Sequence, residues 1–447
     1  GLIKEGKVPS DNRVALTPKQ CKWLKEQHPD WDIIVEASPD RCYKDQEYSK
    51  EGIQIVTDIS KADILLGIKE VPKSQLIAGK TYLFFSHTKK AQSYNQALFH
   101  KMMDLGITLI DYECLEHEDG QRLIGFGFFA GIVGAHNGIM AYGNRTKAYH
   151  LGRVKEVKDY RELIHTYFGL KLPPVKIVVT GSGRVAHGIL EIMNLMDVQQ
   201  VEPDEFDRHY AYPVYVHLKG RDLYAHKITK DYERNDFHTN PANYDCLFKQ
   251  YLAHAQILMN GIYWEPGIPP LFTQEDLLEE EFALTTIADI TDDAHGSVPC
   301  NLGDAPSEEP VYGVNVNTFE KTVPYLPEGI DVMAVGNLPN ELPRDASRFF
   351  GEQLIKYVLP DLVAGGNDII KRAIRDLYAK DVDEIHVEGE EGYKIARSFM
   401  KTLMPSHVKK VHHYKDPYVP LFHKFKIEAQ IDEMYNPVVR LPSGGSI

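Results

Sequence analysis

The sequence predicts an α/β protein in which parallel strands alternate with helices, and two observations carry that prediction. In the first third of the chain, short apolar segments alternate with polar segments of helical length. In the middle, a β-branched run at residues 175–180 breaks into Gly181-Ser-Gly183 and continues into a helical pattern, which is typical of a dinucleotide-binding turn. With 447 residues, the chain is long enough for about three domains.

The strands expected in the first third cover residues 31–36, 62–67, 81–86 and 107–111. Side chains that do chemistry in parallel sheets gather at the carboxyl ends of the strands. At two of these ends stand Lys69, two residues past Gly67, and His87, directly after Ser86. A lysine beside a histidine is suited to acid–base work, because repulsion and partial burial tune both pKa values. The alternative is a solvated loop lysine and a histidine held by ordinary hydrogen bonds.

A connecting helix is expected over residues 126–140. Gly127, Gly131, Gly134 and Gly138 recur there at helical spacing, which would permit close packing against another helix. The same glycines are also compatible with a loop, because each costs about 1 kcal/mol in a helix interior relative to alanine.

The glycine turn at residues 181–183 predicts how a dinucleotide would bind. Gly181 would permit the tight turn from strand to helix, and Gly183 would let a pyrophosphate approach the backbone at the helix N-terminus. A second strand is expected at residues 198–202, ending in Glu202, which lies 21 positions after Gly181. A carboxylate there would bind the adenosine ribose and favour NAD over NADP. A glycine turn in an unrelated α/β fold is the alternative.

The composition excludes several classes of protein. The net charge of −14 argues against a general nucleic-acid or membrane-surface binder. The chain has no apolar run of about 20 residues, the length needed to span a membrane. Its five cysteines are scattered and form no Cys-x-x-Cys pair, so neither a disulfide framework nor a zinc site is indicated, and no metal is expected. We therefore expect a protein of the reducing cytoplasm.

Eight further segments occur in an order that resembles a known family. They are DNRVALTP (residues 11–18), GIKEVP (67–72), FFSHTKK (84–90), DYE (111–113), GFGFFAG (125–131), NGIYW (260–264), ADITDD (288–293) and NLPNELPR (337–344). In this order the chain resembles the lysine-forming saccharopine dehydrogenases and the lysine–2-oxoglutarate reductase half of the bifunctional lysine-degrading enzyme. Alanine dehydrogenase and a transhydrogenase subunit are wider relatives of the same architecture.

This resemblance implies two Rossmann-like domains. The catalytic and substrate domain would comprise residues 1–135 plus 330–366, and the NAD(P)-binding domain, residues 136–329, would be inserted into it. The implied reaction converts saccharopine, NAD(P) and water to lysine and 2-oxoglutarate, or runs in reverse. An alanine dehydrogenase-like amino-acid dehydrogenase is the alternative, and the oligomeric state stays open.

The resemblance also implies roles for individual residues. Lys69 would take the proton of the secondary amine, and His87 would act as the acid and base in the step that involves water. The substrate would be bound by Arg13, Gln92, Glu113, Arg122, Phe126 and Tyr263. The cofactor would be bound by Gly181, Gly183, Arg184, Val185, Glu202, Gly261, Asp289 and Asp293. Guanidinium groups suit a substrate with three carboxylates, because each carboxylate accepts a forked pair of hydrogen bonds. On sequence alone, any of these charged groups could equally be a solvated surface group.

The last part of the chain resembles a different family. The segments at residues 369–378, 382–388, 420–430 and 439–447 are similar to ribonuclease E/G, in the α/β region that resembles ribonuclease H. The segment at residues 367–447 ends before that family's metal-binding aspartates, so nuclease activity is not expected. An RNA-binding or RNA-processing protein is the alternative of another class. Both chain ends look cut, and the junction near residues 366–373 is either a natural fusion or an artefact.

Overall fold

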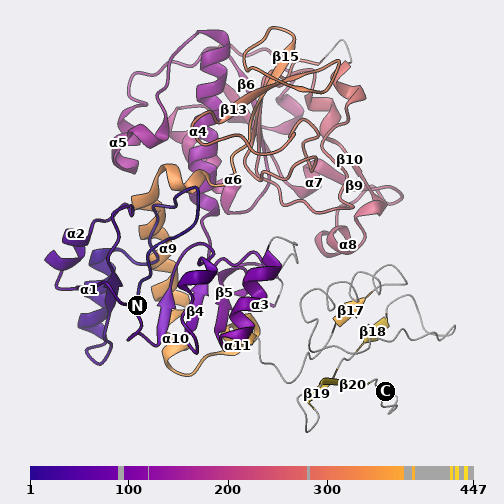
Figure 1. Ribbon diagram of the computed structural model, residues 1–447. Helices are drawn as coiled ribbons and strands as arrows, with labels where there is room; N and C mark the ends of the chain where they lie inside the picture. Colours follow the sequence, from indigo (N-terminus) through magenta and orange to yellow (C-terminus); the bar gives the residue numbers. More distant parts are fainter. Residues whose placement is uncertain are drawn as a thin grey trace. The chain divides into compact units, whose positions relative to one another are not determined.

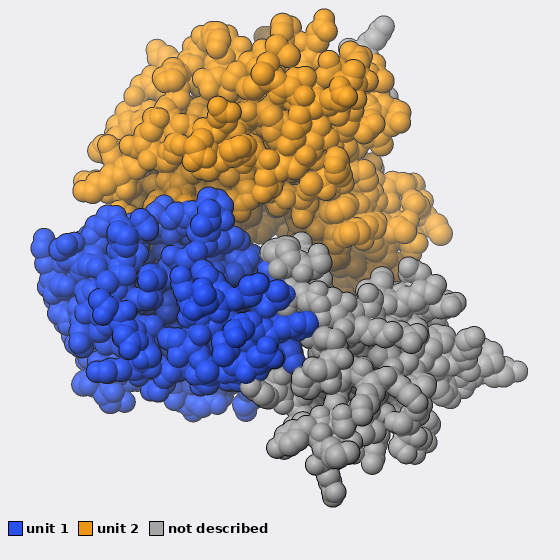
Figure 2. All heavy atoms as spheres, viewed as in Figure 1, with its two compact units in different colours: residues 1–124, 350–447 blue, residues 125–349 orange. Residues whose placement is uncertain are grey.

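The structure is a computed structural model, and the residues that it describes are 1–88, 95–118, 120–278, 282–376, 385–387, 423–425, 428–431 and 437–440. The chain divides into two compact units (Figure 2). Unit 1 comprises residues 1–124 and 350–447, and unit 2 comprises residues 125–349. Among the described residues, no helix is long and apolar enough to cross a membrane.

Unit 1 contains a sheet with the strand order β16-β5-β4-β3. Its strands are β3 (Ile64–Leu66), β4 (Thr81–Phe84), β5 (Thr108–Asp111) and β16 (Ile374–Asp376). The first three are parallel, whereas β16 runs antiparallel to β5 with Ile374 opposite Ile110. The carboxyl ends of β3, β4 and β5 therefore meet at one edge of the sheet.

The first residues of the chain extend this sheet. Leu2 bridges to Leu66 of β3 on one side and to Val35 of β1 (Ile34–Glu36) on the other, and β1 pairs in parallel with β2 (Gln54–Val56). The backbone N–H of Leu2 donates to the carbonyl of Ile34 at 3.0 Å. This pairing places the residues that follow Leu2 at the carboxyl ends of the neighbouring strands.

Helices and short 3₁₀ turns connect the strands of unit 1 (Figure 1). They are α1 (Pro18–Gln27), α2 (Asp45–Lys50), η1 (Lys73–Gln75), α3 (Gln96–Asp104), η3 (Tyr112–Cys114), α10 (Leu359–Val363) and α11 (Asp368–Ala373). Helix α1 begins in a capping box, in which the Thr17 side chain and the Gln20 side chain satisfy each other's backbone N–H groups. The core is built from the inward side chains of the strands and of α3, including Leu65, Tyr82, Phe84 and Met102.

Residues 350–376 complete unit 1, although they lie far from the rest of it in sequence. Helix α9 (Pro343–Tyr357) crosses the unit boundary, and its residue Phe350 is fully buried, with its ring centroid 5.1 Å from that of Tyr112 and 5.9 Å from that of Phe85. Ile370 of α11 is also buried. Together with β16, these contacts make this return segment part of the core of unit 1.

Unit 2 contains an eight-stranded sheet with the order β14-β13-β15-β12-β11-β6-β8-β7. Its strands are β6 (Lys176–Thr180), β7 (Gln199–Val201), β8 (Val214–Leu218), β11 (Ile257–Asn260), β12 (Thr286–Asp289), β13 (Val311–Asn315), β14 (Lys321–Thr322) and β15 (Gly329–Met333). All run in the same direction except β13, which pairs antiparallel with both β15 and β14. The central strands β6, β11 and β12 are buried almost throughout, and their inner positions are mainly apolar.

The remaining elements of unit 2 surround this sheet, as the upper part of Figure 1 shows. They are α4 (Gly127–Thr146), η4 (Val154–Glu156), α5 (Tyr160–His165), α6 (Arg184–Leu195), η5 (Pro203–Glu205), α7 (Gly220–Leu223), α8 (Arg234–Thr239), η6 (Pro241–Asn243), η7 (Phe248–Tyr251), η8 (Glu275–Leu278), η9 (Leu338–Glu341) and the antiparallel pair β9 (Tyr224–His226) and β10 (Tyr244–Cys246).

Helices α4 and α6 touch through glycines. A Cβ atom on Gly131 of α4 would lie 2.1 Å from the carbonyl oxygen of Val185, and one on Gly188 of α6 would lie 2.0 Å from that of Phe128. Two further glycines of α4 lie against β12 and the residue after it, where a Cβ on Gly138 would be 2.8 Å from that of Ala288. Any side chain at these positions would push the backbones apart.

The α/β prediction is confirmed, and so are the expected strands at their centres. The helix expected at residues 126–140 is α4, so the loop alternative is wrong; the energy lost at each glycine is offset by close backbone packing. Strand β2 (Gln54–Val56) was not predicted from the sequence.

Candidate functional site

Two groups of residues lie at the carboxyl ends of strands, one in each unit. In unit 1 the group centres on Lys69 and His87, each three residues beyond the end of its strand. Because β3 and β4 are parallel neighbours, these side chains meet, and Lys69 Nζ lies 3.4 Å from His87 Nε2. The predicted pair is therefore within hydrogen-bonding distance.

The backbone of Lys69 is held by a residue that sequence reasoning missed. Glu5 accepts hydrogen bonds from the N–H groups of Ile68 (2.7 Å) and Lys69 (2.9 Å) through its two carboxylate oxygens. Burial, together with the charge of Asp11, raises the pKa of Glu5 to about 8. No motif marks Glu5, since it reaches this position only because the segment after Leu2 joins the sheet.

The amine of Lys69 is poised to exchange a proton near neutral pH. Burial and, to a smaller extent, the positive charge of Arg13 together lower its pKa to about 8. At pH 7.5 roughly a quarter of such amines would be neutral, against about one in a thousand for a solvated lysine. A neutral amine can accept a proton, so Lys69 has the property required of a general base.

The turn that carries His87 is constrained. His87 has a left-handed backbone with φ of 54°, and its carbonyl accepts a hydrogen bond from Asn95 Nδ2 at 2.9 Å. On its amino side, the buried Ser86 hydroxyl bonds both the Asp111 carboxylate and, at 2.7 Å, the Thr88 hydroxyl. Such positive-φ backbone outside glycine is uncommon and tends to persist where surrounding contacts enforce it.

Two carboxylates flank the His87 ring. Glu113 Oε2 lies 3.6 Å from Nδ1, and Glu70 Oε1 lies 3.8 Å from Nε2. Glu113 also pairs with Arg122 at 3.0 Å, and Glu70 pairs with Lys7 at 2.8 Å. Glu70 had not been singled out from the sequence, although it lies in the segment that contains Lys69.

The other predicted substrate residues are placed as follows. Arg13 is buried and forms a bidentate pair with Asp11 through Nη2 (2.6 Å) and Nε (3.0 Å). Gln92 lies outside the described residues. Phe126 and Tyr263 belong to unit 2, where Phe126 is buried and Tyr263 is exposed with its hydroxyl 3.1 Å from Glu265.

In unit 2 the group centres on Gly181, at the end of β6. Gly181 has φ of +103°, and a Cβ atom on it would lie 2.4 Å from the carbonyl oxygen of Gly261, which follows β11. Its N–H donates to Leu218 at 3.0 Å, and its carbonyl is 2.6 Å from His217 Nε2. Only glycine fits this turn. Residues of the neighbouring strand β8 contact both the N–H and the carbonyl of Gly181, which holds the turn in place.

The turn has the features of a dinucleotide cradle. A Cβ atom on Gly183 would meet nothing within 4 Å, so space is open beside the backbone just before α6 begins at Arg184. The guanidinium of Arg184 lies against Gly125, where a Cβ would be 3.1 Å from Nη1. Close by, a Cβ on Gly127 would lie 3.5 Å from Val185 Cγ2. The open space beside Gly183 and the start of α6, which has no side-chain cap, fit an approaching pyrophosphate.

A buried polar network joins the ends of β6, β11 and β12. Asn260 donates to Asp289 Oδ1 at 2.8 Å and accepts a hydrogen bond from the Thr180 hydroxyl at 2.7 Å, while Asn301 donates to Asp289 Oδ2 at 2.8 Å. Burial raises the pKa of Asp289. Both carboxylate oxygens of this predicted cofactor residue therefore bond protein groups, which fixes the loop around residues 289–301.

The loop after β12 also contains two neighbouring acids. Burial raises the pKa of Asp292 to about 8, and the carboxyl group of Asp304 raises it in the same direction. Asp292 has a left-handed backbone with φ of 57°. Asp293, the acid predicted from the sequence, is half-buried one residue later.

Glu202 follows β7, which the sequence places next after α6. In the sheet, however, β7 pairs only with β8, and β8 lies between β7 and β6. Glu202 is exposed and stands one strand further from Gly181 than the sequence spacing suggests.

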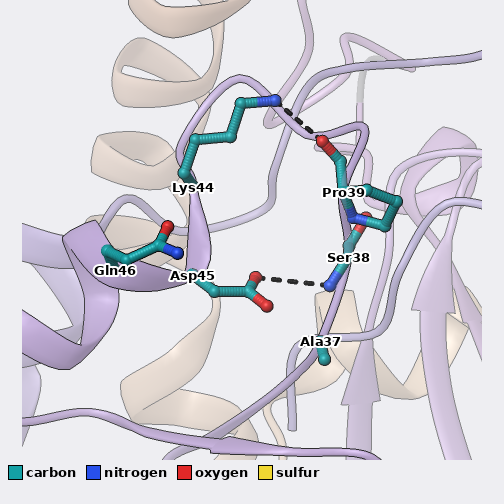
Figure 3. Close-up of a pocket in the computed structure, with 6 residues that line it drawn as sticks. All are labelled: Ala37, Ser38, Pro39, Lys44, Asp45 and Gln46. Carbon is teal, nitrogen blue, oxygen red and sulfur yellow. Dashed lines mark hydrogen bonds between the residues drawn. The ribbon is translucent and has the colours of Figure 1, made fainter.

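A separate hollow of about 310 Å³ lies in unit 1 between the end of β1 and the start of α2 (Figure 3). Its lining residues are Ala37, Ser38, Pro39, Lys44, Asp45 and Gln46. Asp45 accepts from the Ser38 N–H at 3.3 Å, and Lys44 donates to the Pro39 carbonyl at 2.8 Å (Figure 3). Its charged groups are thus engaged in holding the loop, and they supply no second centre.

Comparison with known proteins agrees with the order of the motifs. The rat protein "Alpha-aminoadipic semialdehyde synthase, mitochondrial" is 29% identical over 391 residues, which cover 78% of this chain and 42% of the relative. The Yarrowia lipolytica "Saccharopine dehydrogenase [NAD(+), L-lysine-forming]" is 25% identical over 377 residues, covering 78% of this chain and 89% of the relative. The chain resembles saccharopine dehydrogenases. It spans less than half the length of the rat relative.

Two family models match different parts of the chain, and solved structures match most of it. Residues 1–133 match "Alanine dehydrogenase/PNT, N-terminal domain", and residues 348–447 match the "Ribonuclease E/G family". A solved L-alanine dehydrogenase superposes with a TM-score of 0.57 at 17% identity, covering 84% of this chain and 94% of that one. The transhydrogenase from Sinorhizobium meliloti gives a TM-score of 0.51 at 18% identity, with coverages of 84% and 98%. Both resemblances predicted from motifs are confirmed, and these structures share the fold.

Proposed function

We propose that this protein is an NAD(P)-dependent oxidoreductase that acts on a secondary amine, converting saccharopine and water to lysine and 2-oxoglutarate or catalysing the reverse reaction. The observation that carries the proposal is the Lys69–His87 pair, with 3.4 Å between its nitrogens and a Lys69 pKa of about 8. The similarity to saccharopine dehydrogenases over 78% of the chain supports the choice of substrate.

The residues of unit 2 fit a dinucleotide. Gly181 and Gly261 would border the turn, and the backbone at Gly183 and the start of α6 would bind the pyrophosphate. A bound nicotinamide would accept or donate the hydride. Asp289 would not contact the cofactor itself but would fix the loop after β12. Its carboxylate accepts hydrogen bonds from the amides of Asn260 and Asn301 and from the Thr291 hydroxyl.

The residues of unit 1 would move protons. In the oxidative direction, neutral Lys69 would take the proton of the substrate's secondary amine, which allows the carbon–nitrogen bond to become an imine. His87 would then remove a proton from the attacking water and return it to the departing lysine amine. The carboxylates of Glu70 and Glu113, each within 4 Å of one ring nitrogen, would help to hold the orientation of the His87 ring.

Arginines would orient the carboxylates of the substrate. The Arg122 side chain pairs with Glu113 and is 44% exposed, so it can be approached from solvent. Arg13 is already paired with Asp11, and in this role it would contribute positive charge and a fixed orientation.

The direct test is a steady-state assay of NADPH and NADH oxidation with lysine plus 2-oxoglutarate, compared with pyruvate plus ammonia. We expect turnover with the first pair and Lys69→Met to lower kcat by about 100-fold or more, the scale of general acid–base catalysis. Lys4→Met is the matched control, because Lys4 is exposed and pairs with Glu36. Turnover with pyruvate and ammonia alone would replace this proposal with an alanine dehydrogenase-like one.

A further inference from the structure

Asp111 is the last residue of β5, and its buried side chain bonds two segments that lie apart in the sequence. Its Oδ1 accepts a hydrogen bond from the Glu113 N–H at 2.9 Å, and its Oδ2 accepts one from the Ser86 hydroxyl. In the sheet, Asp111 is opposite Phe84, the last residue of β4. The carboxylate therefore lies at the edge where both strands end.

The bond to Ser86 fixes the backbone on both sides of His87. The Ser86 hydroxyl oxygen also accepts a hydrogen bond from the Thr88 N–H at 3.1 Å and lies 2.7 Å from the Thr88 hydroxyl. Asn95 Nδ2 donates to the His87 carbonyl at 2.9 Å. These bonds enclose a residue with φ of 54°, a left-handed conformation that costs free energy outside glycine and persists where its surroundings enforce it.

The bond to the Glu113 N–H fixes a neighbour of the His87 ring. It caps η3, and Glu113 Oε2 lies 3.6 Å from His87 Nδ1. A single carboxylate thus holds the backbone of the histidine and that of the acid beside it. Burial raises the pKa of Asp111, whereas the hydrogen bonds from Ser86 and Glu113 act in the opposite direction, because they favour the ionised carboxylate.

We infer that Asp111 is a positioning residue that keeps the His87 ring at its working distance from Lys69. It acts through Ser86 and Glu113 and exchanges no proton with the substrate. The inference rests on the proposed acid–base role of His87. His87 Nε2 lies 3.4 Å from Lys69 Nζ, while Nδ1 faces Glu113, so a shift of the ring changes both distances together. A displacement of about 1 Å at a reacting group can lower a rate about 100-fold.

The test is steady-state turnover of the full chain with lysine, 2-oxoglutarate and NADH or NADPH. Ser86→Ala removes the hydroxyl that bonds Asp111, and Asp111→Asn keeps the size of the side chain but replaces one charged acceptor with an amide. Each should lower kcat by about 10-fold and leave the KM for 2-oxoglutarate within about twofold, because a misplaced acid–base group weakens the transition state rather than substrate binding. Ser60→Ala is the matched control, since its N–H bonds the exposed Asp58, and it should not change kcat.

Measurement in a second background separates positioning from a general loss of structure. In the His87→Gln variant no imidazole is left to position, so adding Ser86→Ala or Asp111→Asn should lower kcat by less than about twofold. A further 10-fold loss in that background, or full turnover by both single variants, would overturn the inference. A wild type that does not turn over lysine and 2-oxoglutarate, or a His87→Gln variant with wild-type kcat, would instead overturn the proposed function on which the inference rests.

Discussion

The two units prepare their candidate sites in opposite ways. In unit 1 the site consists of charged side chains crowded together, with Lys69 3.4 Å from His87 and two carboxylates within 4 Å of the ring. In unit 2 the site depends on glycines, which have no side chain. Gly181 lets the turn after β6 approach the Gly261 backbone, and Gly131 and Gly188 let helices α4 and α6 touch. The first arrangement tunes proton affinity through burial, whereas the second creates space and exposes N–H groups. Substitutions should therefore change chemistry in unit 1 and folding in unit 2.

The largest expected effect tests the backbone packing of unit 2. Gly188→Val should destabilise the protein by about 4 kcal/mol, because its Cβ would start 2.0 Å from the Phe128 carbonyl oxygen and the helices would have to separate. Chemical denaturation would measure this loss. Gly183→Ala is the matched control, since nothing lies within 4 Å of its Cβ, and it should lower nucleotide affinity with little loss of stability. Equal destabilisation by both variants would contradict the distinction.

The second prediction concerns the return segment of unit 1. A chain ending after residue 366 should be less stable than one ending after residue 376 by about 3 kcal/mol, because it loses the buried Ile370 and the pairing of β16 with β5. Thermal unfolding of the two truncated chains would show the difference. If they unfold at the same temperature, residues 367–376 contribute nothing to the stability of unit 1.

The third prediction is a pH dependence that arises in unit 2. His136 of α4 is buried, with its ring nitrogens 2.8 Å from the Tyr167 hydroxyl and the Gly152 carbonyl, and burial lowers its pKa from 6.5 to about 4. A depressed pKa contributes stability above pH 6.5 that is lost as the pH falls towards 4. The loss should reach about 3 kcal/mol, since each pKa unit corresponds to about 1.4 kcal/mol.

Denaturation of the wild type and of His136→Gln between pH 7 and pH 4 would isolate this contribution. The variant should be less stable at pH 7, and its stability should fall less steeply with acid. Parallel curves for the two proteins would show that another group is responsible.

The smallest expected effect tests how charge tunes unit 1. The oxidative kcat/KM should rise with pH to a plateau with a midpoint near pH 8, because Lys69 must be neutral to accept a proton. Removing the Arg13 charge in Arg13→Met should move that midpoint upward by about 0.5 to 1 pH unit, since Arg13 lowers the pKa of Lys69. Lys4→Met should leave the midpoint where it is. A midpoint that does not respond to Arg13→Met would assign the titration to another residue.

The sequence predicted the local features of both units correctly. Strand centres, the helix at residues 126–140 and the turn at Gly181 are visible because hydrophobic period, β-branched runs and glycine spacing are properties of short segments. That Lys69 and His87 lie close together could be predicted, because each follows a strand of its own and parallel neighbouring strands bring such positions together.

The rest depended on pairings between distant segments, and only the tertiary structure decided them. Glu5 holds Lys69 because Leu2 enters the sheet between β1 and β3. Strand β8 lies between β6 and β7, which separates Glu202 from Gly181 despite the expected spacing in sequence. Residues 350–376 join unit 1 through Phe350 and β16. The local sequence determines whether a segment forms a helix, a strand or a turn. Which strands pair depends on the apolar burial of the whole chain, and a short stretch of sequence does not carry that information.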